Sequence, residues 1–215
     1  DFEIETIVVN DGSPDHLVEA ANKFKSKIGN LVVIDRKENR GKGLRINLSA
    51  SSFVPKPFTP FQWEPQDPID TLVEKQRYLK NKIKSKQISY SWHDSELSFV
   101  EAVFARGDRK IGKALIKAWE KGCKFDGWGE HFKFDLWVDA FKECEIDPAF
   151  YATRRRDYEE ILPWDHIDIG VTKKFFINEN ENAKKSELTP NCRQTCAGCG
   201  CTVFKKGECI DEAKG

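Results

Sequence analysis

The sequence predicts an α/β protein, with a truncated parallel sheet followed by a mostly helical C-terminal region and a Cys-rich tail. Two observations predict this class. In the first half of the chain, short β-rich runs alternate with helical patterns, which favours parallel strands joined by crossovers. From residue 94 onward helical periodicity predominates, until four cysteines gather near the C-terminus.

The first elements form a strand–helix–strand unit. Residues 4–9 and 31–34 are apolar runs typical of buried strands, and residues 16–27 have apolar side chains at helical spacing. A unit of this length favours a parallel pair with a right-handed crossover. The charged and Gly-rich residues 36–43 predict a loop.

A second set of elements follows. Residues 45–53 alternate apolar and polar side chains and predict a strand. The five prolines that come next exclude a helix or a central strand. A helix is expected over 69–84, where Asp67 or Asp70 can cap it, and a short strand over 88–92.

The second half of the chain predicts helices. They are expected at 95–107 with Asp94 or Ser95 as the cap, at 110–121 closed by Gly122, at 133–144, and as a mostly helical charged stretch over 148–162. After Trp164 we expect irregular structure, with a polar and mobile segment over 178–190.

Several side chains in this half are assigned structural roles. Four aromatic residues lie at helical spacing and are expected in the core rather than in a nucleic-acid stacking platform: Trp119, Phe134, Trp137 and Phe141. His131 is expected to be packed between aromatic neighbours, and Arg154–Arg156 to be a solvated helix face. Trp164, Asp165 and His166 are expected to have a structural role.

Composition limits the function classes. Thirty-five basic residues balance thirty-five acidic ones, so there is no reason to expect nucleic acid or an anionic membrane as a partner. No apolar run approaches the roughly 20 residues that span a bilayer, and no signal-peptide pattern is present. A cytoplasmic protein with a small-molecule substrate of unknown identity is expected. The sequence contains no methionine, which favours a fragment of a longer product.

The tail contains the most informative pattern. Its first three cysteines read C-x3-C-x2-C, and neighbouring thiolates of this kind bind iron–sulfur clusters or zinc. The alternative is an inert or disulfide-paired tail. Zinc is the second choice of metal, because two well-separated C-x2-C pairs are absent. The expected ligands are Cys192, Cys196, Cys199 and Cys201, with Cys209 in reserve.

Residues 1–43 resemble the start of a family 2 glycosyltransferase. The likeness lies in Ile-Val-Val-Asn-Asp-Gly-Ser at 7–13, Val-Ile at 33–34 and Glu-Asn-Arg-Gly-Lys-Gly at 38–43. The resemblance implies that Asp11 contacts the nucleotide of a sugar donor, at the strand edge where open α/β sheets bind ligands. The later metal-binding carboxylate motif and the catalytic base of that family have no candidate after residue 43.

From about residue 44 to 215 the chain resembles the C-terminal part of radical SAM enzymes of the cobalamin-binding type. The similar blocks lie at 46–63, 101–109, 122–128 and 162–168, and end in the cysteine run. The resemblance implies the end of a barrel over 44–107, a helical extension over 108–190 and a metal-binding tail over 191–215.

This second resemblance also implies cofactors. The intact parent would carry a 4Fe-4S cluster, cleave S-adenosylmethionine and have cobalamin as a possible partner. The cluster loop that this chemistry needs would lie upstream, so the fragment is expected to be inactive alone. The terminal cysteines would then bind an auxiliary cluster or a structural metal.

The first reading is therefore a fragment of a radical SAM enzyme. The alternatives are a glycosyltransferase fragment and a non-enzymatic metal-binding module, and the junction near 40–45 is interpreted as an artefact or an unusual fusion. Under the first reading Ser49 and Ser51 would touch S-adenosylmethionine, and His93 would be a general base or substrate contact. The alternatives are an ordinary exposed strand end and a surface histidine beside a capping Asp94.

Overall fold

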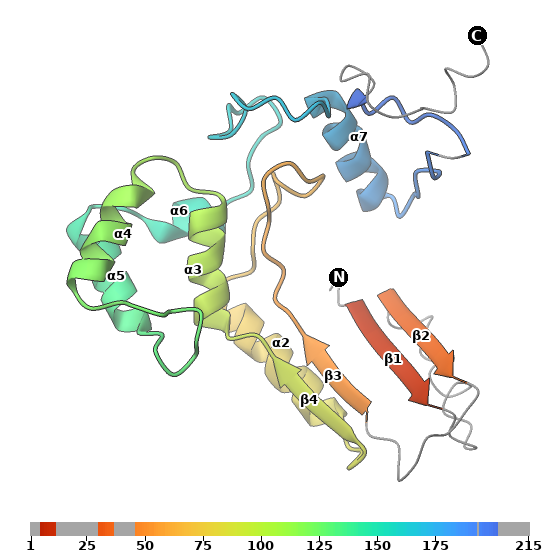
Figure 1. Ribbon diagram of the computed structural model, residues 1–215, viewed down its shortest axis with the longest axis horizontal. Helices are drawn as coiled ribbons and strands as arrows, with labels where there is room; N and C mark the ends of the chain where they lie inside the picture. Colours follow the sequence, from red (N-terminus) through yellow and green to blue (C-terminus); the bar gives the residue numbers. More distant parts are fainter. Residues whose placement is uncertain (1–4, 12–29, 37–45, 193, 202–215) are drawn as a thin grey trace. The chain divides into compact units, whose positions relative to one another are not determined.

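The computed structural model describes residues 5–11, 30–36, 46–192 and 194–201 (Figure 1). The chain divides into two compact units. The first comprises the described residues within 1–53, 67–99 and 127–132, and the second those within 54–66, 100–126 and 133–215. The expected helix over 16–27, most of the expected loop over 36–43 and the reserve ligand Cys209 lie outside the described residues.

In the first unit, β1 (Glu5–Asp11) and β2 (Asn30–Arg36) pair in parallel. The register runs from Glu5 opposite Asn30 to Asp11 opposite Arg36. The runs rich in valine and isoleucine therefore form the predicted strands, and their parallel pairing is confirmed. Both strands extend past the predicted C-terminal ends, so that Asp11 and Arg36 belong to them.

A second parallel pair consists of β3 (Ile46–Ala50) and β4 (Ile88–Trp92), with Ile46 opposite Ile88. α2 (Ile69–Lys82) lies between them in sequence, as the crossover of a parallel pair requires. The expected caps of α2 are wrong, because the helix begins after Pro68 without a side-chain cap. Asp67 instead forms an ion pair with Lys75.

The other helices of the described residues follow the predictions closely up to residue 152. They are α3 (Ser95–Ala105), α4 (Ile111–Glu120), α5 (Phe134–Glu143) and α6 (Pro148–Ala152). Asp94 caps α3 as predicted, since its Oδ1 accepts a hydrogen bond of 2.8 Å from the Leu97 N–H. Gly122 follows α4 with a φ of 97°, which is the usual helix C-terminal signal.

Two predictions about the C-terminal third are wrong. The stretch 148–162 is helical only as far as Ala152, and residues 154–157 have no regular structure. The polar stretch after residue 172 forms α7 (Lys173–Lys184) instead of an irregular segment. Thr172 caps α7, because its side chain accepts from the Phe175 N–H, and Phe176 and Asn180 are buried one turn apart.

The second unit contains a core cluster of Trp63, Leu162, Trp164 and Phe176. Elsewhere in this unit α4 packs beside α5, and Trp137 and Phe141 are buried as predicted. Phe134 is only half-buried.

The expectation for Trp119 is wrong, because this side chain is 61% exposed. The buried face of α4 consists of Ile111, Ala114 and Ala118. The small side chains of Ala114 and Ala118 on that face let α4 and α5 approach each other, and Trp119 lies on another face of α4. His131 is also exposed rather than packed. In the described part of the chain, no helix is long and apolar enough to cross a membrane.

Candidate functional site

The carboxyl edge of β1 and β2 carries the first predicted site residue. Asp11 is the last residue of β1 and lies opposite Arg36, the last residue of β2. Because the two strands are parallel, both residues mark the same edge. Open α/β sheets bind ligands outside the carboxyl ends of their strands.

The carboxyl edge of β3 and β4 gathers three further predicted residues. Ser49 lies opposite Ser91 near the end of β3, and Ser51 follows the strand. The His93 N–H donates to the Ala50 carbonyl at 3.0 Å, so the chain after β4 stays paired with the end of β3. Ser49 and Ser51 are exposed and His93 is half-buried. The structure thus brings Ser49, Ser51 and His93 to one edge.

A hydrogen-bond chain orients His93. Its Nδ1 lies 2.6 Å from the Ser98 Oγ, and the Ser98 hydroxyl donates to the Asp94 carbonyl at 2.7 Å. A carbonyl only accepts, so the single hydroxyl proton of Ser98 goes to Asp94. The His93 Nδ1 must then carry a hydrogen and donate to Ser98. In the neutral ring this leaves Nε2 without a proton, as an acceptor.

Gln76 of α2 supports the same segment. Its Nε2 donates to the His93 carbonyl at 2.9 Å, and its Oε1 accepts from the Ser95 hydroxyl at 3.1 Å. Ser95 and Ser98 are both buried. The turn that presents His93 is therefore held by side chains from α2 and from the first turns of α3.

The cysteine run lies after α7. Cys192, Cys196 and Cys201 are exposed and Cys199 is half-buried, and all are thiols. Among the described residues, no three His, Cys, Asp or Glu side chains form a group that could hold a metal ion. The chemistry of the four thiols fits iron–sulfur or zinc binding, but the described geometry does not gather three donors. Cys123 is separate from this run and buried, and burial raises the pKa of its thiol.

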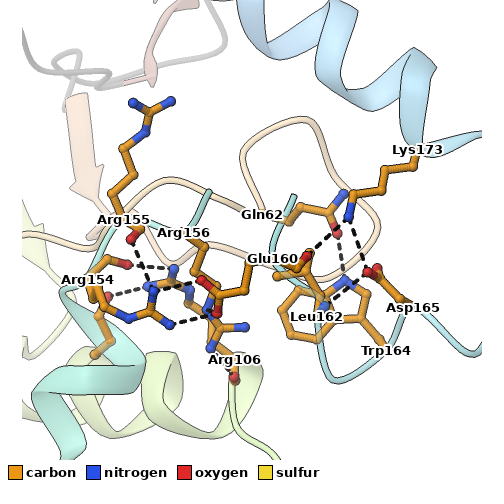
Figure 2. Close-up of polar contacts among 11 residues, drawn as sticks. Gln62, Arg106, Arg154, Arg155, Arg156, Glu160, Leu162, Trp164, Asp165 and Lys173 are labelled. Atoms are coloured by element: carbon orange, nitrogen blue, oxygen red, sulfur yellow. Dashed lines mark hydrogen bonds and ion pairs between the residues drawn. The ribbon is translucent and has the colours of Figure 1, made fainter. Parts of the chain in front are cut away.

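A buried arginine cluster in the second unit was missed by the sequence reasoning (Figure 2). Arg106 is fully buried and donates to the carbonyls of Ala152 and Arg154, both at 2.8 Å. Arg156 is 3% exposed and donates to the Arg106 carbonyl at 2.6 Å. The expected helix is therefore wrong, and so is the expected exposure of Arg156, because tertiary hydrogen bonds replace the helix at this point; Arg155 is exposed as expected.

Electrostatics in this cluster follow from burial and from one shared carboxylate. Burial, with the charges of Arg156 and Arg154, lowers the pKa of Arg106 to about 10. Burial also lowers the pKa of Arg156. Arg154 donates to both oxygens of Glu160, at 2.7 and 2.8 Å, and this bidentate contact lowers the pKa of Glu160. No sequence motif marks these residues, which come together only through the fold.

Trp164 and Asp165 have the structural role that was expected for residues 164–166. The Trp164 Nε1–H donates to the Gln62 Oε1 at 2.6 Å, and Asp165 Oδ2 accepts from the Leu162 N–H at 3.0 Å (Figure 2). Asp165 also accepts from Lys173 at 3.3 Å, while His166 is exposed. Trp164 and Asp165 therefore stabilise the core of the second unit.

Residues 1–51 match the family model for glycosyl transferase family 2. The match covers 51 of the 215 residues, so it describes a likeness of the N-terminal region alone. It continues past residue 43 and includes β3. Comparisons with curated proteins and with solved structures found no match. Nothing in these comparisons supports the radical SAM resemblance, which stays a prediction.

Proposed function

We propose that the N-terminal region binds the nucleotide part of a nucleotide sugar. The observation that carries this proposal is the family 2 match over residues 1–51 together with the parallel pairing of β1 and β2. Asp11 then lies at the edge where a nucleotide would be recognised, and its carboxylate would accept hydrogen bonds from nucleotide N–H or O–H groups. Sugar transfer is not part of the proposal, because the sequence offers no later metal-binding motif or catalytic base.

Titration calorimetry with uridine diphosphate tests this proposal. Asp11→Asn should weaken binding by about tenfold, which corresponds to about 1.4 kcal/mol. Asp139→Asn is the matched control, since it makes the same change at an exposed position of α5. Uridine diphosphate that does not bind, or that binds both variants equally, would contradict the proposal.

A second proposal concerns the cysteine run. We propose a thiolate-ligated metal centre formed by Cys192, Cys196, Cys199 and Cys201, either an iron–sulfur cluster or zinc. Four thiols within ten residues support it, because soft thiolate ligands select such centres. Elemental analysis after oxygen-free purification should find iron or zinc bound to the protein. Protein that contains neither would contradict the proposal.

The radical SAM relationship of residues 44–215 is a third proposal. Its support is the parallel pair β3–β4, with Ser49, Ser51 and His93 at one carboxyl edge. Under this proposal, Ser49→Ala combined with Ser51→Ala should weaken S-adenosylmethionine binding in equilibrium dialysis. Ser85→Ala in the exposed turn before β4 is the control. A protein that binds neither S-adenosylmethionine nor cobalamin would argue against this relationship.

A further inference from the structure

The turn Cys196–Gly200 has the sequence Cys-Ala-Gly-Cys-Gly. Within it the Gly198 N–H donates to the Cys196 Sγ, with an N···S distance of 3.4 Å. Hydrogen bonds from backbone N–H groups to sulfur commonly surround the thiolate ligands of metals. Such contacts also orient thiolate ligands and tune the metal that they hold. Cys196 is therefore oriented by its own turn.

Two glycines set the path of this turn. Gly198 has a φ of 67° and Gly200 a φ of 100°, a left-handed conformation that glycine adopts without steric cost. At Gly200 a Cβ would lie 2.8 Å from the Thr172 Cγ2 and 3.1 Å from the Gly170 carbonyl oxygen. Any side chain there would push the turn away from Thr172. The backbone path from Cys196 to Gly200 therefore depends on both glycines.

The same turn is attached to α7. The Thr172 N–H donates to the Cys199 carbonyl at 2.9 Å, and Thr172 is the residue whose side chain caps the helix. Cys199 is half-buried, in contrast to the three other cysteines of the run. The backbone of Cys199 is thus held at the N-terminus of α7.

We infer that this turn is a preformed half-site for a single zinc ion. Cys196 and Cys199 bind the ion first, before the other two cysteines. This inference rests on the proposed thiolate centre and specifies its metal and its order of assembly. Cys192 and Cys201 then complete a tetrahedral four-sulfur site. Cys196 and Cys199 form a C-x2-C pair, a spacing typical of structural zinc sites, and three and one residues separate this pair from Cys192 and Cys201. Metal binding supplies the free energy that brings in the outer two thiolates.

Titration of the reduced, metal-free protein with Co²⁺ under nitrogen tests the inference. One Co²⁺ per chain should bind with the charge-transfer and ligand-field absorption of a tetrahedral thiolate site, and Zn²⁺ should displace it. Cys196→Ser and Cys199→Ser should abolish this spectrum. Cys144→Ser, at the C-terminal end of α5, is the matched control and should leave it unchanged.

Gly200→Ala tests the preformed turn separately. The added methyl group should lower the Zn²⁺ affinity by about 10- to 100-fold, the usual effect of disturbing the groups that orient metal ligands. The far-UV circular dichroism of the apoprotein should stay unchanged. Wild-type affinity in this variant would overturn the preformed half-site.

Parallel reconstitution with iron and sulfide separates the remaining outcomes. A stable brown cluster in a protein that does not retain zinc would overturn the single-ion site and leave the proposed thiolate centre intact. A protein that binds neither zinc nor a cluster would overturn both.

Discussion

Arg106 and Arg156 are two guanidinium groups held in the interior of the second unit. Arg106 satisfies two backbone carbonyls and Arg156 one. Hydrogen bonds to charged groups contribute about 1.5–3 kcal/mol each, and orphaned buried acceptors are costly. We therefore predict that Arg106→Met lowers the free energy of unfolding by more than Arg156→Met. Urea denaturation at neutral pH measures both losses.

Charge repulsion between the two arginines does not separate these variants. The positive charge of Arg156 lowers the pKa of Arg106, so removing Arg156 relieves a repulsion while it breaks one hydrogen bond. Removing Arg106 relieves the same repulsion but breaks two hydrogen bonds; the Arg154 carbonyl loses this donor, whereas the Ala152 carbonyl keeps the Gln66 N–H at 2.9 Å. A larger loss for Arg156→Met would show that the carbonyl contacts of Arg106 contribute less than the contacts of Arg156.

Glu160 makes the stability of the second unit dependent on acid. Its pKa is lowered by the bidentate contact with Arg154, so the folded state binds this proton less tightly than the unfolded state. The stabilisation is complete above the ordinary glutamate pKa of about 4.3 and is lost as pH falls through the lowered pKa. We predict that Glu160→Gln is less stable at pH 7 and loses less stability on acidification.

Urea denaturation at a series of pH values from 7 downward measures this effect. Glu159→Gln is the matched control, because Glu159 is an exposed neighbour, and it should keep the wild-type slope. An unchanged slope in Glu160→Gln would mean that other carboxylates account for the acid sensitivity.

At the scale of single residues, strand ends were predictable and buried ion clusters were not. Ser49, Ser51 and His93 lie at or just after the ends of predicted strands, and parallel pairing brings such residues to one edge. Arg106 and Arg156 form a hydrogen bond although they are 50 positions apart in the sequence. In the sequence nothing distinguishes them from solvated arginines, because their burial depends on which segments the fold brings together.

Among the elements, α7 shows why local patterns fail. Its composition is polar, and only Phe176 and Asn180 are buried, so the hydrophobic periodicity is weak. A capping threonine one residue before the helix was the available signal. The opposite error occurred over 148–162, where a helix was predicted from composition but ends at Ala152. There the Arg106 side chain donates hydrogen bonds to the carbonyls of Ala152 and Arg154.

The cap of α7 gives a prediction at this scale. Thr172→Ala removes the side-chain acceptor of the Phe175 N–H and should lower the free energy of unfolding by about 1 kcal/mol. Thr172→Ser is the matched control, because it keeps the hydroxyl oxygen and loses only the methyl group. Thermal denaturation followed at 222 nm compares the two variants. Equal losses would assign the effect to methyl packing instead of capping.

For the molecule as a whole, the first parallel pair, the strands of the second pair and most helices were predictable, whereas the core of the second unit was not. That core joins segments about a hundred positions apart, since Trp164 donates to Gln62 across 102 positions. Periodicity identifies which face of a helix is apolar, but it cannot say which distant segment covers that face. For this reason Trp119 was assigned to the core by its helical spacing, while the irregular segment around Trp63 was not assigned to it.

Trp63 contacts segments of the second unit that lie far from it in the sequence. Its side chain is fully buried, its ring stacks edge-on against Tyr158 at 5.0 Å, and its carbonyl accepts from the Arg156 N–H at 2.9 Å. Trp63→Ala would remove ring contacts to residues far along the chain and leave a cavity. We predict a loss of about 3–5 kcal/mol in the free energy of unfolding.

Trp119→Ala is the control for this prediction. It removes the same side chain from an exposed helix face and should cost less than about 1 kcal/mol. Urea denaturation followed by far-UV circular dichroism measures both variants. Similar losses in the two would mean that the segments around Trp63 are held together by their hydrogen bonds rather than by burial of this ring.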